Sequence, residues 1–333
     1  MAYLGIYVGN MNTRTDAIPF PEATIVSVNG IDLEVFEAGR ENVGNPIVLC
    51  HGWPDLAYTW RYQIPALVAA GYHVIAPNQR GFGNSTRPDE IIEYDIEHLT
   101  DDLAALLDHF GYERATFIGH DWGAFIVWSF TLLHPQRVDR VVALSLPYLA
   151  RGEVPWLDFM EAVLGSDYYF VHFTKQPGVA DAVFDADPAR FINNLYRRDE
   201  PLMPPQPGMA LIEIARNDSP LGEPLLTERD LAVYESAFAH SGFTGGINWY
   251  RNLNRNWHLL ASADPVIHQP ALMIYGLRDA VARSEQLSTF VPNVAELSFD
   301  SGHWVQQERH SETTSAILEW LARNPVSSEA QSG

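Results

Sequence analysis

The sequence contains few basic residues, a single cysteine and no long apolar run. Its 333 residues contain 42 Asp and Glu against 21 Lys and Arg, which gives a formal net charge of −21. So acidic a chain disfavours a nucleic acid or an anionic membrane as partner. The single cysteine, Cys50, excludes an internal disulfide, and no Cys/His spacing indicates a zinc site. We therefore expect no bound metal and no nucleic acid.

Membrane and export signals are also missing from the sequence. No apolar run reaches the ~18 residues that a transmembrane helix needs. Residues Met1–Phe20 lack the basic start and long apolar run of a signal peptide. Cys50 ends the apolar run Ile47–Leu49, a context that favours a buried, inert thiol over a catalytic one. We expect a cytoplasmic protein that does not enter the membrane.

Strand and helix patterns alternate along most of the chain, which predicts an α/β fold with a mostly parallel sheet and helices on both faces. Asn29-Gly30 joins two short strand patterns and predicts a hairpin. Apolar runs at 46–50, 72–76, 115–118, 141–146, 271–275 and 294–299 predict further strands, and the periodicity predicts helices at 57–70 and 96–110. This rhythm is typical of an open α/β sheet.

The rhythm is interrupted between residues 149 and 258, where aromatic residues are frequent. Thr227–Asp230 resembles a capping box at the start of a helix. Pro201–Gly208 is rich in proline and predicts a loop. We interpret 149–258 as an inserted helical lid, and 1–148 with 259–333 as the α/β core.

The stretch Gly119–Gly123 carries the strongest chemical signal. A strand pattern precedes it and a helix pattern follows it, with glycines two residues either side of Asp121. Such a strand–turn–helix holds its central side chain up at the end of the strand, where it can act as a nucleophile. A carboxylate needs no general base to attack. The alternative is that Asp121 only caps the helix.

Polar side chains follow three predicted strands, in the order nucleophile, acid, histidine. Asp121, Asp279 and His303 stand at the carboxyl ends of these strands, the edge where open α/β sheets bind ligands. Each has an ordinary alternative, since Asp279 fits a turn and His303 fits a packed surface position. Together they predict an ester on Asp121 that His303, oriented by Asp279, hydrolyses through an activated water.

Hydrolysis of such an ester places negative charge on the Asp121 carbonyl oxygen, and backbone N–H groups must face it. The residue after the nucleophile, Trp122, is expected to supply one N–H. The turn His51–Pro54 is expected to supply the second, from Trp53.

The runs His51–Asp55, Gly119–Gly123 and Gly302–Trp304, with the lid run Ile247–Asn252, resemble those of epoxide hydrolases of the α/β-hydrolase fold, from about residue 22 to 325. The resemblance implies that Tyr250 opens the epoxide ring.

A second lid tyrosine is expected before the run Thr174–Gly178, which departs from the family pattern by one residue. Counting back from Phe173 selects Tyr169, whereas counting back from Pro177 selects Phe170, which has no donor. His172 is a further alternative, because some relatives use histidine in this role.

The resemblance implies conversion of a small hydrophobic epoxide and water to a vicinal diol, with no cofactor. Haloalkane dehalogenases share Asp, Trp, acid and His and remain an alternative, as does a catalytically silent binding protein. The native epoxide, the enantio- and regioselectivity, and whether the chain forms a homo-oligomer are left open. The residues expected to shape the pocket are His51, Trp53, Trp122, Phe170, His172, Phe173, Trp249 and Trp304.

Overall fold

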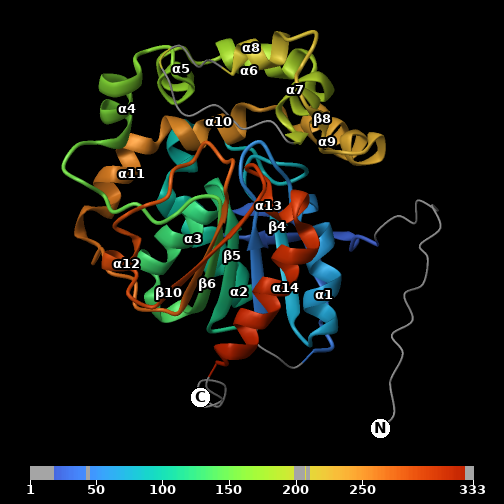
Figure 1. Cartoon of the computed structure of the whole chain (residues 1–333), viewed down its shortest axis with the longest axis vertical. Helices are drawn as coiled ribbons and strands as arrows, with labels where there is room; N and C mark the ends of the chain where they lie inside the picture. Colours follow the sequence, from blue (N-terminus) through green and yellow to red (C-terminus); the bar gives the residue numbers. More distant parts are fainter. Residues whose placement is uncertain (1–18, 43–45, 199–206, 208–210, 327–333) are drawn as a thin grey trace.

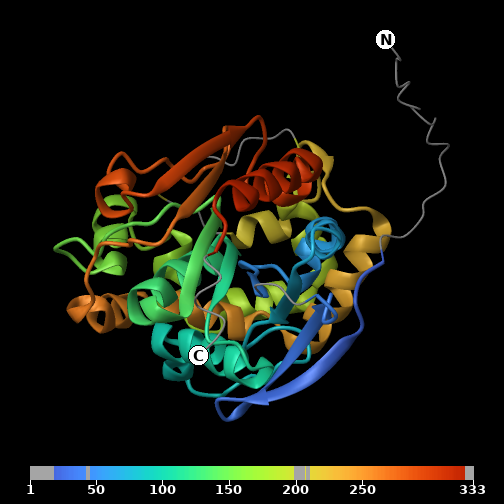
Figure 2. The same cartoon turned by 90° about the horizontal axis from the view of Figure 1, so that it is seen from below.

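The computed structural model describes residues 19–42, 46–198, 207 and 211–326. A sheet of eight strands runs through it in the order β1-β2-β4-β3-β5-β6-β9-β10 (Figures 1 and 2). The strands are β1 (Ala23–Val28), β2 (Ile31–Ala38), β3 (Pro46–Cys50), β4 (His73–Asn78), β5 (Ala115–His120), β6 (Val138–Leu144), β9 (Ala271–Gly276) and β10 (Val294–Phe299). Neighbours from β4 to β10 run parallel, which confirms the predicted α/β sheet.

The hairpin β1–β2 forms the antiparallel edge of the sheet (blue in Figure 2). Its turn residues Asn29 and Gly30 have φ of 48° and 76°. Two successive positive φ angles are what a type I′ turn needs, and asparagine and glycine are the residues that tolerate them. The hairpin predicted from this pair is therefore confirmed.

Helices cover both faces of the sheet. On one face, α1 (Gln63–Ala69) and α14 (His310–Arg323) pack against Ile47 and Leu49 of β3. On the other, α2 (Ile96–Phe110) and α3 (Trp122–Leu133) pack against Val48. Successive β3 side chains point to opposite faces, so a continuous apolar strand fits between two helical layers.

The helix predicted at 57–70 begins as a 3₁₀ helix, η1 (Ala57–Tyr62), and continues as α1. Pro65 lies in the first turn of α1 and has no N–H to offer the carbonyl of Arg61, four residues earlier. The α-helical bonding therefore begins only after the 3₁₀ turn. The remaining short elements of the core are η2 (Ile91–Tyr94), η3 (Pro135–Arg137), η4 (Leu260–Ser262), α12 (Leu287–Phe290) and α13 (Val305–Glu308).

A further group of helices follows β6. It comprises α4 (Trp156–Leu164), α5 (Tyr169–Lys175), α6 (Val179–Ala186), α7 (Pro188–Leu195), α8 (Ile212–Arg216), α9 (Glu228–Ser241), α10 (Thr244–Arg251) and α11 (Leu253–Leu259), with a short antiparallel pair, β7 (Arg197–Arg198) and β8 (Glu223–Pro224). Most of these helices gather above the sheet in Figure 1. Thr227 and Asp230 form the predicted capping box of α9. The loop predicted at 201–208 lies, except for residue 207, outside the described residues.

The strand order places the candidate nucleophile at a switch point. From β3 the chain moves to β4 on one side, then crosses to β5 on the other side of β3. In open α/β sheets, ligands bind outside the carboxyl ends of the strands at such a point. The turn after β3 and the elbow after β5 meet there.

Candidate active site

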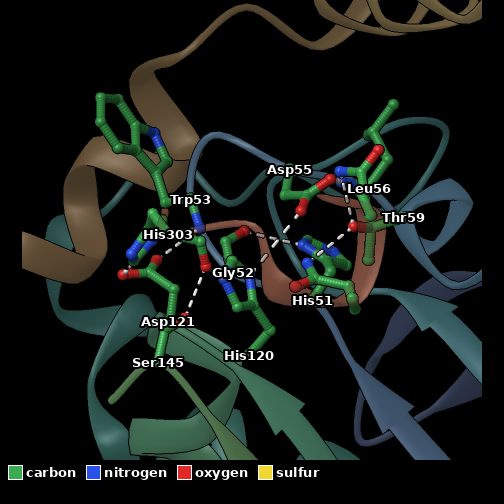
Figure 3. Close-up of polar contacts among 12 residues, drawn as sticks. His51, Gly52, Trp53, Asp55, Leu56, Thr59, His120, Asp121, Ser145 and His303 are labelled. Atoms are coloured by element: carbon green, nitrogen blue, oxygen red, sulfur yellow. Dashed lines mark hydrogen bonds and ion pairs between the residues drawn. The ribbon is translucent and has the colours of Figure 1, made fainter. Parts of the chain in front are cut away.

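Asp121 occupies the sharp turn between β5 and α3, with φ 53° and ψ −122° (Figure 3). Its side chain makes no capping hydrogen bond to α3, so the interpretation of Asp121 as a mere helix cap is wrong. Gly52, in the turn after β3, lies against it, because a Cβ on Gly52 would come within 2.7 Å of the Asp121 Oδ1. Glycine at position 52 lets the two turns meet.

This close approach gives Asp121 a backbone hydrogen-bond donor. The Trp53 N–H donates to the Asp121 Oδ1 at 2.9 Å. Trp53 is one of the two residues expected to face the developing oxyanion. The other, Trp122, opens α3 directly after Asp121, where backbone N–H groups have no partner inside the helix.

His303 lies between two carboxylates. Its Nδ1 lies 2.9 Å from Asp279 Oδ2 and 3.1 Å from Oδ1. Its Nε2 lies 3.6 Å from Asp121 Oδ2. The strand ends thus bring together all three residues that the sequence singled out. Nearby Asp300 pairs instead with Arg278, at 3.1 Å.

The charges of these three groups are coupled. Burial lowers the pKa of His303, but Asp279 and Asp121 outweigh burial and raise it well above its usual value. Burial raises the pKa of Asp121, yet His303 outweighs it and lowers the pKa. The two shifts favour a protonated His303 paired with an ionised Asp121.

Tyr250, on α10, and Tyr169, on α5, lie together, with ring centroids 5.7 Å apart. Burial raises the pKa of each phenol well above its usual value, and the charge of Asp121 raises both further. Both phenols therefore stay protonated and can donate. The Trp122 ring packs edge-on against the Tyr250 ring, with centroids 4.9 Å apart. An indole N–H can only donate, so Trp122 does not compete for the proton of the phenol.

The two alternatives for the second donor have different surroundings. Tyr169 lies close enough to Asp121 for that charge to raise the pKa of the phenol, and its ring contacts that of Tyr168, with centroids 4.8 Å apart. His172, on the same helix, has Asp167 and Asp181 as its charged neighbours. Burial lowers the pKa of His172, and these carboxylates only partly offset the effect.

The predicted pocket residues fall into two groups. Trp53, Trp122, Phe170 and Phe173 surround Tyr250, with ring centroids 4.9 to 5.4 Å from it. The predicted residues His51, Trp249 and Trp304 make other contacts. Trp249 stacks on His51, and Trp304 stacks on Tyr196. His51, Phe173 and Trp249 have no accessible surface, so they support the site from behind and do not line it.

His51 differs from expectation because both of its ring nitrogens have partners in the fold. Its Nδ1 lies 2.9 Å from the carbonyl of Gly52, and its Nε2 accepts from the Gln79 N–H at 3.0 Å. Burial lowers its pKa to about 4. A neutral His51 therefore holds the turn that positions Trp53.

Sequence reasoning assigned no role to Asp55 and His120, although both stand in the quoted motifs. Both are fully buried, with Asp55 Oδ2 lying 3.9 Å from His120 Nδ1. Burial raises the pKa of Asp55 to about 6 and lowers that of His120 to about 4. Asp55 Oδ1 accepts from the Tyr234 hydroxyl at 2.6 Å, which ties α9 to the turn after β3.

Two residues of α10 set the place of Tyr250 and were also missed. A Cβ on Gly246 would lie 2.3 Å from the Trp53 ring, so only glycine lets α10 approach so closely. Arg251 donates to the carbonyl of Phe173 at 2.9 Å and to Asp181 at 2.8 Å. The first bond joins α10, which carries Tyr250, to α5, which carries Tyr169, and the second joins α10 to α6. Such contacts connect distant segments and leave no local sequence signal.

Within residues 19–42, 46–198, 207 and 211–326, no three His, Cys, Asp or Glu residues are grouped so as to hold a metal ion. In the same ranges, no helix is both long enough and apolar enough to cross a membrane.

Residues 45–309 match a family model described as alpha/beta hydrolase fold, in agreement with the order of the strands in the sheet. The class of protein is therefore an α/β-hydrolase. The chain is 43% identical over 315 residues to epoxide hydrolase A of Mycobacterium tuberculosis, which covers 90% of this chain and 97% of that protein. The chain belongs to the epoxide hydrolases of the alpha/beta hydrolase fold family.

Other relatives and solved structures agree. Identity to bifunctional epoxide hydrolase 2 of Sus scrofa is 35% over 326 residues, covering 94% of this chain and 58% of that protein. The crystal structure of epoxide hydrolase A from Mycobacterium thermoresistibile superposes with a TM-score of 0.84 at 42% identity, covering 92% of this chain and all of that one. An epoxide hydrolase from Vigna radiata gives 0.82 at 33% identity, covering 93% of this chain and 100% of the other.

Proposed function

We propose that this epoxide hydrolase forms a covalent ester on Asp121 and hydrolyses it with water activated by His303. The supporting observation is the pairing of the two Asp121 oxygens. Oδ1 accepts from the Trp53 N–H, whereas Oδ2 lies 3.6 Å from His303. Oδ2 attacks a ring carbon, and Oδ1 becomes the carbonyl oxygen of the ester.

Ring opening breaks the bond between that carbon and the epoxide oxygen. The oxygen leaves as an alkoxide that remains on the same molecule and takes a proton from a phenol. Tyr250 and Tyr169 supply the donors, since burial keeps both protonated. Phenols stabilise the developing charge without carrying charge of their own in the ground state.

The coupled charges explain how His303 becomes a base. In the free enzyme, Asp121 and Asp279 raise the pKa of His303. Alkylation removes the charge of Asp121 and with it one of these two influences, so the pKa of His303 falls. His303 can then return its proton to the phenolate left by ring opening, take a new one from water and direct the hydroxide to the ester carbonyl. Collapse of the tetrahedral intermediate releases the diol and restores the carboxylate.

The second donor is Tyr169 in this proposal. The charged neighbours of His172 are Asp167 and Asp181 and do not include Asp121, so His172→Phe is expected to leave the rate of ester formation within twofold of wild type. The dehalogenase alternative would use the Trp122 indole for halide, but the Tyr250 ring packs against that indole, with centroids 4.9 Å apart. A silent binding protein would have no use for a complete Asp121–His303–Asp279 arrangement.

The aromatic rings around Tyr250 favour a small hydrophobic epoxide as substrate. Residues 149–258 act as a lid over a core formed by 1–148 and 259–333, because α5 and α10 bring the tyrosines to the strand ends. No cofactor takes part in these steps. Cytoplasmic location stays a prediction, and the oligomeric state stays open.

Trapping of the ester tests this mechanism. His303→Gln is expected to permit alkylation and to block hydrolysis, so mass spectrometry after mixing with styrene oxide should show the mass of the substrate on the peptide that contains Asp121. His240→Gln, which changes an exposed histidine of α9, is the control and should turn over normally. An adduct on another residue, or no adduct with an epoxide that the wild type converts, contradicts the proposal.

A further inference from the structure

Ser145 holds a strained backbone conformation directly after β6. Among the described residues, three that are not glycine have positive φ: Asn29, Asp121 and Ser145. Asn29 is in the hairpin turn, and Asp121 is the nucleophile at its elbow. Ser145, with φ 65° and 1% of its surface exposed, is in neither place. Serine is uncommon in this left-handed region, whereas glycine adopts it freely.

The Ser145 hydroxyl explains why a side chain is kept there. Its Oγ donates to the backbone carbonyl of His303 at 2.5 Å (Figure 3). Its N–H donates to the carbonyl of Ile274, at the end of β9, at 2.9 Å. The left-handed turn therefore joins the end of β6 to both β9 and the loop that carries the catalytic histidine.

His303 needs such a support, because it lies between β10 and α13 in a segment without helix or strand. The His303 carbonyl takes no part in the hydrogen bonding of the sheet. It accepts hydrogen bonds from two side chains instead. One is Ser145 Oγ, and the other is His120 Nε2, at 2.9 Å. Asp279 orients the imidazole ring, while Ser145 and His120 fix the backbone from which that ring projects.

We propose that Ser145 is a positioning residue for ester hydrolysis, acting through the backbone of His303. This inference rests on the proposed function, in which His303 acts in the second half-reaction. Loss of the hydroxyl leaves the His303 carbonyl with His120 as its one remaining side-chain partner among the described residues and loosens the distance between Nε2 and the ester. Ring opening uses Asp121 and the lid tyrosines, so it does not depend on this bond.

Two substitutions separate the hydroxyl from the backbone strain. Ser145→Ala removes the hydroxyl and keeps the strain, whereas Ser145→Gly removes the hydroxyl and relieves the strain. Both are expected to slow ester hydrolysis about 10-fold to 100-fold in single-turnover experiments with styrene oxide, the range expected for a misplaced catalytic group. Ester formation should stay within twofold of wild type, and Ser145→Gly should be at least as stable as Ser145→Ala.

Asn29→Gly is the matched control, because it relieves a positive φ far from the site and should change neither rate. A folded Ser145→Gly variant that hydrolyses its ester at the wild-type rate overturns the inference, as does equal slowing of both half-reactions. If Ser145→Ala does not fold, Ser145→Gly alone decides. If His303→Gln accumulates no ester on Asp121, the proposed function itself fails; if it does accumulate ester while Ser145→Gly behaves as wild type, only this inference fails.

Discussion

Replacement of Tyr250 by phenylalanine tests the role of the lid in ring opening. Tyr250 is 2% exposed, and its ring packs against the Trp122 indole, with centroids 4.9 Å apart. One donor to a developing oxyanion contributes about 3 kcal/mol, or roughly 10²-fold in rate. Tyr250→Phe should therefore slow formation of the Asp121 ester about 100-fold and leave hydrolysis of a preformed ester close to wild type.

The same substitution should have little structural effect. Phenylalanine keeps the ring contacts of Tyr250 with Trp53 and Trp122. Denaturant unfolding should therefore show a loss of stability no larger than about 1 kcal/mol, the net contribution of one hydrogen bond. Tyr94→Phe is a matched control, because Tyr94 is also buried and its hydroxyl makes one bond, to the carbonyl of Pro88 at 2.9 Å. Stopped-flow tryptophan fluorescence with an epoxide substrate measures ester formation in both variants.

The control should lose stability without losing ester formation. If Tyr250→Phe forms the ester within twofold of the wild-type rate, the argument for phenol donors is refuted, whatever its stability. If Tyr94→Phe is slowed as much as Tyr250→Phe, the effect is one of folding and not of ring opening.

Three further outcomes are expected. Asp279→Asn should slow ester hydrolysis by about 10⁴-fold, as loss of the histidine-orienting acid does in a serine protease, measured by single-turnover decay of the ester. Tyr169→Phe should slow ester formation about 100-fold, and the double variant with Tyr250→Phe should nearly abolish it; normal ester formation in Tyr169→Phe would exclude that residue as a donor. The free energy of unfolding should fall as pH drops from about 6.5 to about 4, because the unfolded chain protonates His51 and His120 there, while the folded protein, with both pKa values lowered to about 4, does not. Asp55, with its pKa raised to about 6, offsets part of this loss. A free energy of unfolding that stays constant or rises on acidification would contradict the prediction.

The features that could be predicted from the sequence are those with a local signature. Asn29-Gly30 predicts its hairpin because two positive φ angles are needed at adjacent positions. Glycines on both sides of Asp121 predict the elbow for a similar reason. Asp279 and His303 could be placed at one edge because parallel strands bring their carboxyl ends together.

The features that could not be predicted depend on contacts between distant segments. Gly246 looks like an ordinary helix residue until α10 is packed against Trp53. Ser145 looks like any serine after a strand, and only the fold places it under the His303 carbonyl. His51 shows the opposite error: its motif suggested a pocket residue, whereas the fold uses both of its ring nitrogens. Composition and spacing carry no information about these distances.

The groups that hydrolyse the ester and the donors that assist ring opening come from different parts of the chain. In the proposed mechanism, Asp279 and His303 hydrolyse the ester and follow strands of the sheet, as does the nucleophile Asp121. Tyr169 and Tyr250, the proposed donors for ring opening, come from helices of the proposed lid. Exchanging lid helices should thus change which epoxides are attacked and how fast, while ester breakdown remains a property of the sheet. With an epoxide that forms the ester slowly, the free enzyme accumulates during turnover, and with one that forms it fast, the ester accumulates. The proposed lid thereby determines which of the two forms predominates.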